Sequence, residues 1–129
     1  MKSIICIIAV VMVVFSGCLQ QEEEPTTYMD VSPLKAKELM DNNPDLVVID
    51  VSPYYDQGHL PGAVHYQVGD ALDEAVQSLD KNGTYLVYCH SDSVSIQAAQ
   101  TLVDAGFKNV YRLEGNYRAW VDAGYEIET

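Results

Sequence analysis

Three short runs of consecutive apolar residues mark the centre of the predicted fold. They read LVVID at 46–50, TYLVYC at 84–89 and NVYRL at 109–113, and they are rich in β-branched and aromatic residues. Runs of this length without polar alternation are typical of strands buried on both faces of a sheet. A further short strand is predicted at AVHY, from Ala63.

Between these runs the apolar residues recur at helical spacing. A first helix is predicted after Ser32, an N-cap residue followed by Pro33, and its inward side would carry Leu34, Leu39 and Met40. Further helices are predicted within 69–83, 95–107 and 115–124. For the helix at 95–107, the hydroxyl of Ser95 is a candidate N-cap.

Strands that alternate with helices predict a parallel sheet with helices on both faces, so the fold class is α/β, small and doubly wound. Ligands of such sheets bind in the crevice at the carboxyl ends of the strands. Asp50 and Ser52 lie at one such end, and the loop 89–95 lies at another. Asp50 is expected to cap or brace the loop beside it.

The N-terminal residues follow a different pattern. Lys2 precedes an apolar stretch, Ile4 to Phe15, that is too short to span a bilayer comfortably, which indicates a signal peptide at 1–17. The stretch ends in FSGC and resembles the lipobox of prokaryotic lipoproteins, which implies a lipid on Cys18. An uncleaved anchor is the alternative. Either arrangement predicts an exported protein, held on the outer face of the cytoplasmic membrane or the periplasmic side of an outer membrane.

Composition and charge restrict the kinds of partner that the protein is expected to bind. Residues 18–27 would form a lipidated, acidic tether, and 28–129 would form one domain. The chain of 129 residues has 19 acidic residues against 7 Lys and Arg, a formal charge of −12, and no basic cluster. Nucleic acid is therefore not an expected partner, and the acidity is interpreted as a solvated surface.

Cysteine usage points to chemistry at a single thiol. With Cys6 in the leader and Cys18 lipidated, Cys89 would be the one thiol of the mature domain, and no disulfide could form within it. A thiolate between a strand end and a helix N-terminus is stabilised by backbone N–H groups, so Cys89 is a candidate nucleophile. Such a loop could hold a persulfide without a metal or organic cofactor. The alternative is a small buried hydrophobic residue.

The order of the motifs resembles the rhodanese domain in its single-domain form. The segments LVVIDVS, YYDQGHLPGAVHY and YLVYCHSDSVSIQAAQTLVDAGFKNVYRLEGNYRAWVDAGY carry the resemblance, which extends from Tyr28 to about Tyr125. It implies a five-stranded parallel sheet and transfer of sulfur from a small donor to a thiol or protein acceptor, through a persulfide on Cys89. The residues implied to bind substrate are His90, Ser91, Asp92, Ser93, Val94 and Ser95, with support from Asp50, Ser52 and His59.

The loop departs from the family pattern Cys-x-x-Gly-x-Arg-Ser. Asp92 stands at the glycine position and Val94 at the arginine position, while Ser52 stands where an Asp-Val-Arg sequence would place arginine. Val94 cannot form the charged hydrogen bonds that bind a dianion such as thiosulfate. Asp92 is expected to repel such a donor and to favour the protonated thiol. The sequence therefore predicts poor use of thiosulfate and a neutral or protein-bound donor.

The three histidines have different expected roles. His90 could favour the thiolate as an imidazolium if it turned inward, although neighbouring side chains tend to point apart. His59 is interpreted as a turn residue whose ring bonds to backbone, and His65 as a strand residue; no metal site is expected.

A cysteine phosphatase or arsenate reductase would need an arginine that closes the loop, and neither Arg112 nor Arg118 lies in that loop. A degenerate loop that only binds a partner remains open.

Overall fold

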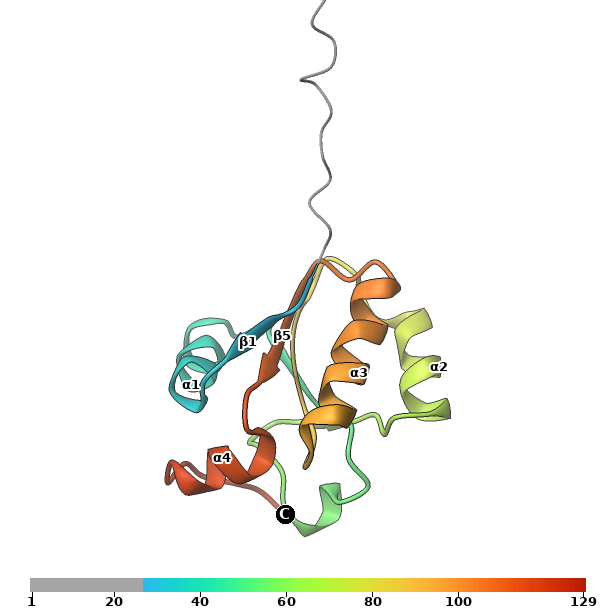
Figure 1. Ribbon diagram of the computed structural model, residues 1–129. Helices are drawn as coiled ribbons and strands as arrows, with labels where there is room; N and C mark the ends of the chain where they lie inside the picture. The colour runs from blue at the N-terminus through green and yellow to red at the C-terminus, as the bar shows by residue number, and fades with distance from the viewer. Residues whose placement is uncertain (1–26) are drawn as a thin grey trace, which may run out of the picture.

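The described residues, 27–129 of the computed structural model, form a five-stranded parallel sheet with helices on both faces (Figure 1). The strand order is β1-β5-β4-β2-β3. The strands are β1 (Met29–Val31), β2 (Val47–Asp50), β3 (Val64–His65), β4 (Thr84–Tyr88) and β5 (Asn109–Leu113). The helices are α1 (Pro33–Asn42), α2 (Asp70–Ser78), α3 (Asp92–Asp104) and α4 (Asn116–Asp122), with a 3₁₀ turn at Tyr55–Gln57. The predicted α/β class is confirmed.

The central strand β4 divides the interior into two cores. Tyr85, Val87 and the following Cys89 face α2 and α3, where they pack with residues such as Leu102 and Phe107. Leu86 and Tyr88 face the opposite side, with Ala36 of α1 and Trp120 of α4. Figure 1 shows these two helix pairs on the two sides of the sheet. Because side chains alternate along a strand, both faces of β4 are apolar, as its sequence predicts.

Helix α1 begins where the sequence predicts, but its inward side differs from the prediction. The Ser32 hydroxyl accepts a hydrogen bond from the Lys35 N–H at 3.2 Å, which is the expected cap. Leu34 is 61% exposed, however, and the fully buried residue of the helix is Ala36. The prediction for Leu34 was wrong because a small residue lets the helix lie close to the sheet.

Helix α3 begins at Asp92, three residues before the predicted start. Ser91 is its N-cap residue in extended conformation, and the Ser95 N–H donates to the Ser91 carbonyl at 3.2 Å. Ser95 is therefore not an N-cap: it is fully buried within the helix, and its hydroxyl donates to the Asp92 carbonyl at 3.2 Å. An acidic residue in the first turn is favoured by the helix dipole, which extends the helix back to Asp92.

The two ends of the domain are both tied into it. Strand β1, which apolar pattern alone did not predict, pairs in parallel with β5 at the edge of the sheet. Near the C-terminus, Glu128 forms an antiparallel bridge with His59. The predicted signal peptide, Cys18 and nearly all of the tether lie outside the described residues. In the range 27–129, no helix has the length and apolar character that a membrane crossing requires.

Candidate active site

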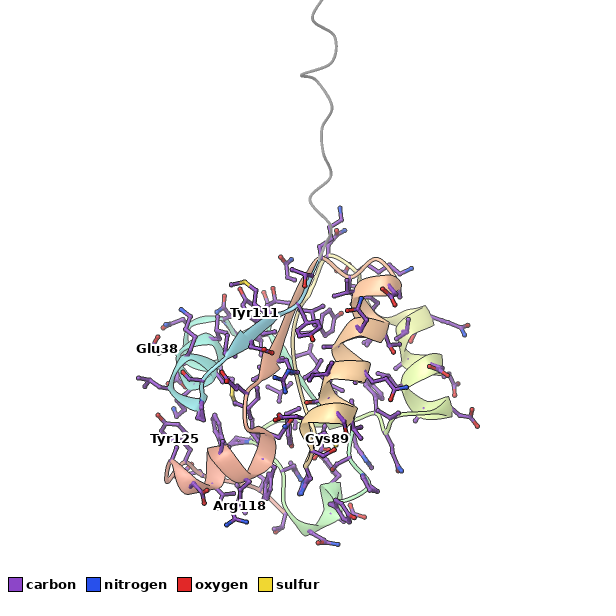
Figure 2. The ribbon with its side chains drawn as sticks, viewed as in Figure 1. Glu38, Cys89, Tyr111, Arg118 and Tyr125 are labelled. Carbon is purple, nitrogen blue, oxygen red and sulfur yellow. The ribbon has the colours of Figure 1, made fainter. Side chains whose placement is uncertain are left out.

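Cys89 lies at the carboxyl end of β4, beside the first turn of α3 (Figure 2). Its side chain is 3% exposed. A crevice of about 390 Å³ opens over it and is lined by Pro53, Tyr54, Cys89, His90, Ser91 and Val94. The lining comes from the loops after β2 and β4 and, through Val94, from the first turn of α3. β2 and β4 are the two adjacent strands whose carboxyl ends the sequence singles out. None of these six side chains carries a fixed positive charge.

The first turn of α3 supplies hydrogen-bond donors next to the thiol. In the described part of the chain, the N–H groups of Asp92, Ser93 and Val94 have no backbone acceptor, as is usual for the first turn of a helix. Together with the helix dipole, they create a positive potential at the end of the helix where Cys89 lies. The arrangement favours a negatively charged sulfur over a neutral one.

The carboxylate of Asp92 is held by partners outside the crevice. Its Oδ1 accepts from Arg112 Nη1 at 2.9 Å and from Asn116 Nδ2 at 2.6 Å. The expectation of an unpaired carboxylate at Asp92 is therefore corrected, since Arg112 of β5 forms an ion pair with it. Because Arg112 also pairs with Asp30, the group of three keeps a net charge of −1, and Asp92 is only partly compensated.

Arg112 is buried and bound by several partners. It is 4% exposed, and besides Asp92 it donates from Nε to Asp30 Oδ1 at 2.7 Å and from Nη1 to Ser95 Oγ at 3.1 Å. Burial alone would lower the pKa of Arg112, but its hydrogen bonds to Asp30 and Asp92 outweigh burial and raise it. The guanidinium is thus a permanent cation, and Arg112 is not among the residues that line the crevice.

The other arginine does not reach the crevice either. Arg118 is 86% exposed on α4, with its Nε 3.4 Å from Asp122 Oδ2, and Figure 2 shows it on the outer side of that helix. The phosphatase or arsenate reductase alternative needs an arginine that closes the loop around an oxyanion. The described residues bring none to the crevice.

His90 forms one wall of the crevice and remains exposed. Its ring stacks on Tyr117 with centroids 4.5 Å apart and lies tilted against Tyr54 at 5.1 Å. Partial burial between these rings lowers the pKa of His90, against the opposing charge of Asp50. The ring is therefore mainly neutral at pH 7, and it does not supply the imidazolium that could have compensated for the missing arginine.

Asp50 and Ser52 brace the loop on the other side of the crevice. The fully buried Asp50 accepts at Oδ1 from the Ser52 N–H at 2.7 Å and from Ser52 Oγ at 2.6 Å. Ser52 Oγ also accepts from the Tyr54 N–H at 3.1 Å, which fixes Tyr54 at the rim. The prediction that Asp50 braces its loop is confirmed.

The second oxygen of Asp50 has a partner that sequence reasoning missed. Tyr88, interpreted only as a core strand residue, donates its hydroxyl to Asp50 Oδ2 at 2.9 Å and accepts the Leu60 N–H at 3.0 Å. Burial, followed by the charge of Asp50, raises the pKa of Tyr88 far above its usual range. A tyrosine in the last position of a fully buried strand was the available signal, because its hydroxyl needs a partner there.

Other predicted site residues are not brought to the thiol. His59 bonds through Nδ1 to the Tyr55 carbonyl at 2.9 Å, as expected of a turn residue, and it does not line the crevice. Ser93 and Ser95 are also absent from the lining. His65, in β3 as predicted, donates from Nε2 to the Ser52 carbonyl at 2.6 Å.

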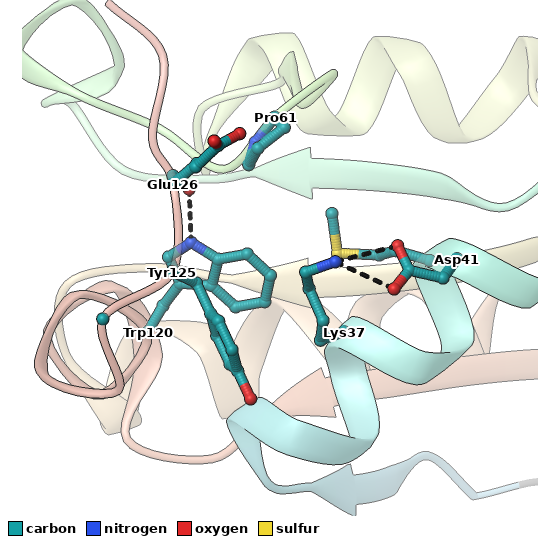
Figure 3. Close-up of a pocket in the computed structure, with 8 residues that line it drawn as sticks. Lys37, Asp41, Pro61, Trp120, Tyr125 and Glu126 are labelled. Carbon is teal, nitrogen blue, oxygen red and sulfur yellow. Dashed lines mark hydrogen bonds and ion pairs between the residues drawn. The ribbon is translucent and has the colours of Figure 1, made fainter.

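A second cavity of about 480 Å³ lies at the opposite face of the sheet (Figure 3). Its lining is Lys37, Met40, Asp41, Pro61, Trp120, Gly124, Tyr125 and Glu126. Lys37 pairs with Asp41 at 2.8 Å, and the Trp120 indole donates to the Glu126 carbonyl at 2.8 Å. Lys37 and Asp41 therefore partner each other at the cavity. In the part of the chain described, no three His, Cys, Asp or Glu side chains are grouped as metal ligands.

Comparison with known proteins places this geometry in a family. The model of the Rhodanese-like domain matches residues 32–123. The thiosulfate sulfurtransferase GlpE of Coxiella burnetii is 37% identical over 95 residues, which cover 72% of this chain and 87% of that protein.

Solved structures agree with the sequence matches. The crystal structure of the Alr3790 protein from Anabaena sp. has a TM-score of 0.71 and 31% identity, covering 76% of this chain and 81% of that one. The polysulfide-sulfur transferase of Wolinella succinogenes has a TM-score of 0.66 and 26% identity, with 78% of each chain covered.

Proposed function

The chain belongs to the rhodanese-like family, and from this premise we propose that it is a sulfurtransferase or sulfur carrier that works through a persulfide on Cys89. The observation that carries the proposal is the placement of Cys89 at the floor of a crevice, beside the unpaired N–H groups that begin α3. The buried-hydrophobe alternative accounts for the burial of the thiol, but it does not account for the crevice over it.

The proposed reaction has two displacement steps. The Cys89 thiolate attacks the outer sulfur of the donor, so that an Sγ–S bond forms, the donor S–S bond breaks, and its electron pair leaves with the remainder of the donor. An acceptor thiolate then attacks the outer sulfur of the persulfide, and the Cys89 thiolate is released. The outer sulfur of the persulfide would lie about 2 Å from Sγ. The N–H groups that begin α3 are the donors available to its negative charge.

The residues that line the crevice restrict which sulfur donors the protein would use. With Val94 in its wall, Arg112 paired with carboxylates and His90 mainly neutral, the crevice offers a thiosulfate dianion backbone N–H groups but no cationic side chain. The loss of one such contact corresponds to about ten- to a hundredfold in affinity or rate. We therefore favour a neutral or protein-bound sulfur donor. The Wolinella relative suggests polysulfide as a further candidate, which as an anion would depend on the N–H groups of α3 for its binding.

Export and anchoring form part of the proposal. Their support is the sequence: the apolar stretch up to Phe15, the FSGC sequence that would place a lipid on Cys18, and the acidic tether that follows. The acceptor would then be a thiol compound or a protein outside the cytoplasm. A mass measurement on the membrane fraction, before and after removal of ester-linked fatty acids, tests the modification of Cys18.

A catalytically inactive binding module is the second candidate. The observation in its favour is the missing cation of the crevice, since such a loop could bind a partner without turning over. It keeps the family fold but requires no reactivity at Cys89. The two candidates therefore differ in whether the thiol acquires sulfur.

Intact mass spectrometry separates them. The protein is exposed to thiosulfate, polysulfide and an organic persulfide in turn, with Cys89→Ser as the control. A gain of one sulfur that a reductant removes, and that the control lacks, is the expected result, with the persulfide donor loading faster than thiosulfate. No gain from any donor, with Cys89 reduced and intact, would overturn the proposal in favour of the binding module.

A further inference from the structure

Asn116 has an unusual backbone conformation for its residue type. Among the described residues it is the one non-glycine residue with positive φ, at 58°, and it is 2% exposed. It follows Gly115, whose φ is 77°, in the turn between β5 and α4. Residues in the left-handed region persist where the surrounding contacts hold them there, and such residues often occur at functional sites.

The contacts that hold Asn116 lead directly to Cys89. Asn116 Oδ1 accepts the Cys89 N–H at 3.1 Å, and the N–H of the next residue, Tyr117, donates to the Cys89 carbonyl at 3.0 Å. The amide orientation is determined by its partners, because Cys89 offers a donor and Asp92 offers only acceptors. Both backbone polar groups of Cys89 are therefore bound by residues 116 and 117.

The other half of the amide holds Asp92. Asn116 Nδ2 donates to Asp92 Oδ1, the same oxygen that accepts from Arg112. Arg112 is anchored in turn by Asp30 of β1. This network joins β1, β5, α3 and α4, and it keeps the only carboxylate of the Cys89 loop on the side that faces Arg112.

We propose that Asn116 is a positioning residue for Cys89. It fixes the peptide group of Cys89 and keeps Asp92 paired with Arg112, so that the sulfur meets the N–H groups of α3 and no free carboxylate. The consequence for sulfur transfer rests on the proposed function, whereas the consequence for thiol reactivity does not. The charged or titratable groups near the thiol are His90, Asp92 with Arg112, and the buried Asp50.

Two single variants test the two halves of the amide. Asn116→Gly keeps the left-handed conformation accessible and removes both hydrogen bonds. Asn116→Asp keeps an acceptor for the Cys89 N–H but places a carboxylate against Asp92. Alkylation of Cys89 by iodoacetamide at pH 7 is expected to slow by about tenfold in Asn116→Asp, the factor for one lost hydrogen bond, and by at least as much in Asn116→Gly. The pH midpoint of alkylation should move upward in both.

The exchanged pair Asn116→Asp with Asp92→Asn is the matched control. In this double variant, the carboxylate at 116 accepts from the Cys89 N–H and from the new amide at 92. The oxygen of that amide still accepts from Arg112. Each of the three hydrogen bonds therefore has a donor and an acceptor again. The pair removes the repulsion between two carboxylates but leaves one carboxylate beside the Cys89 N–H, so partial recovery is expected. An alkylation rate above that of Asn116→Asp, beyond what additive effects of the single changes allow, would support the proposal.

Two results would overturn it. One is a wild-type alkylation profile in folded Asn116→Gly with only the melting temperature changed, which would make Asn116 merely structural. The other is an exchanged pair that is as slow as Asn116→Asp. If Asn116→Asp does not fold, Asn116→Gly decides alone. Failure of the wild-type protein to load sulfur would refute the proposed function and leave the alkylation comparison valid.

Discussion

The hydroxyl of Tyr88 has two hydrogen-bond partners in an interior that offers few others. It donates to Asp50 and accepts from the Leu60 N–H, and both Asp50 and Leu60 are fully buried. Tyr88→Phe would leave a carboxylate oxygen and a backbone N–H unsatisfied while keeping the ring in place. Because buried unsatisfied groups are costly, we expect a loss of about 1–3 kcal/mol in the free energy of unfolding by urea titration.

Tyr85→Phe is the control for that substitution. Tyr85 lies on the same strand, and its hydroxyl reaches the partly exposed carbonyl of Asp80 at 2.7 Å, where water can replace it. The change at Tyr85 should therefore cost less. An equal loss for the two variants would argue that the hydroxyl of Tyr88 contributes nothing specific to the loop beside the crevice.

His90 gives a prediction about pH. Since burial lowers its pKa from the usual 6.5, the folded protein binds this proton less readily than the unfolded chain. The contribution of His90 to stability is therefore present above about pH 6.5 and is lost as the pH falls through the lowered pKa of the folded state. An NMR titration of the imidazole, assigned with His90→Gln, should show a midpoint below that of the unfolded chain. A midpoint above it would mean that an anion approaches the ring more closely than the structure shows.

At the scale of elements, the turn between β5 and α4 depends on Gly115. Its φ of 77° is left-handed, and a Cβ there would lie 2.5 Å from the Ala119 side chain. Gly62 has a similar φ of 73°, but a Cβ there would meet nothing within 4 Å. Gly62→Ala should cost about 1–2 kcal/mol, because of the left-handed conformation alone. Gly115→Ala should destabilise the domain more, because the contact with Ala119 is added to that cost.

Urea denaturation of both alanine variants measures that difference. Since Gly115 directly precedes Asn116, the alkylation rate of Cys89 should also fall in Gly115→Ala and stay unchanged in Gly62→Ala. Equal destabilisation by the two substitutions would show that α4 can move away from the turn at little cost.

The elements differ in how far the sequence predicts them. Strands β2, β4 and β5 are predictable because burial on both faces leaves an uninterrupted apolar run. Strand β1 is not, since its three residues contain Asp30, and pairing with β5 places them in the sheet. The start of α3 was missed for a related reason: Asp92 resembles a loop residue until Arg112 and Asn116 provide partners for its carboxylate.

The same distinction separates the parts of the candidate site. Cys89 and Asp50 are predictable because both lie at the ends of buried strands, where parallel sheets place their crevices. Tyr54, Arg112 and Asn116 come from three other segments, and only their long-range contacts connect them to the thiol. Local pattern identified the candidate nucleophile, whereas the groups that set its surroundings depend on tertiary structure.

At the scale of the whole molecule, charge should govern access to Cys89. The formal charge of −12 repels anions at long range, and none of the side chains that line the crevice has a fixed positive charge to offset it. Iodoacetate and iodoacetamide provide a matched pair of probes, because they alkylate the same thiol and differ mainly in charge. We expect iodoacetate to react more slowly with Cys89, relative to its reaction with a small free thiol.

The difference in rate between iodoacetate and iodoacetamide should depend on salt. Raising the ionic strength from about 0.01 M to 1 M shortens the screening length from about 30 Å to 3 Å, so a deficit that arises from long-range repulsion should shrink with salt. A deficit that persists in high salt would place the unfavourable charge inside the crevice and would point to Asp92 having left Arg112. Faster alkylation by iodoacetate would reveal a cation at the thiol, and it would remove the physical reason to expect poor use of thiosulfate. The probe pair therefore tests donor selectivity before any donor is known.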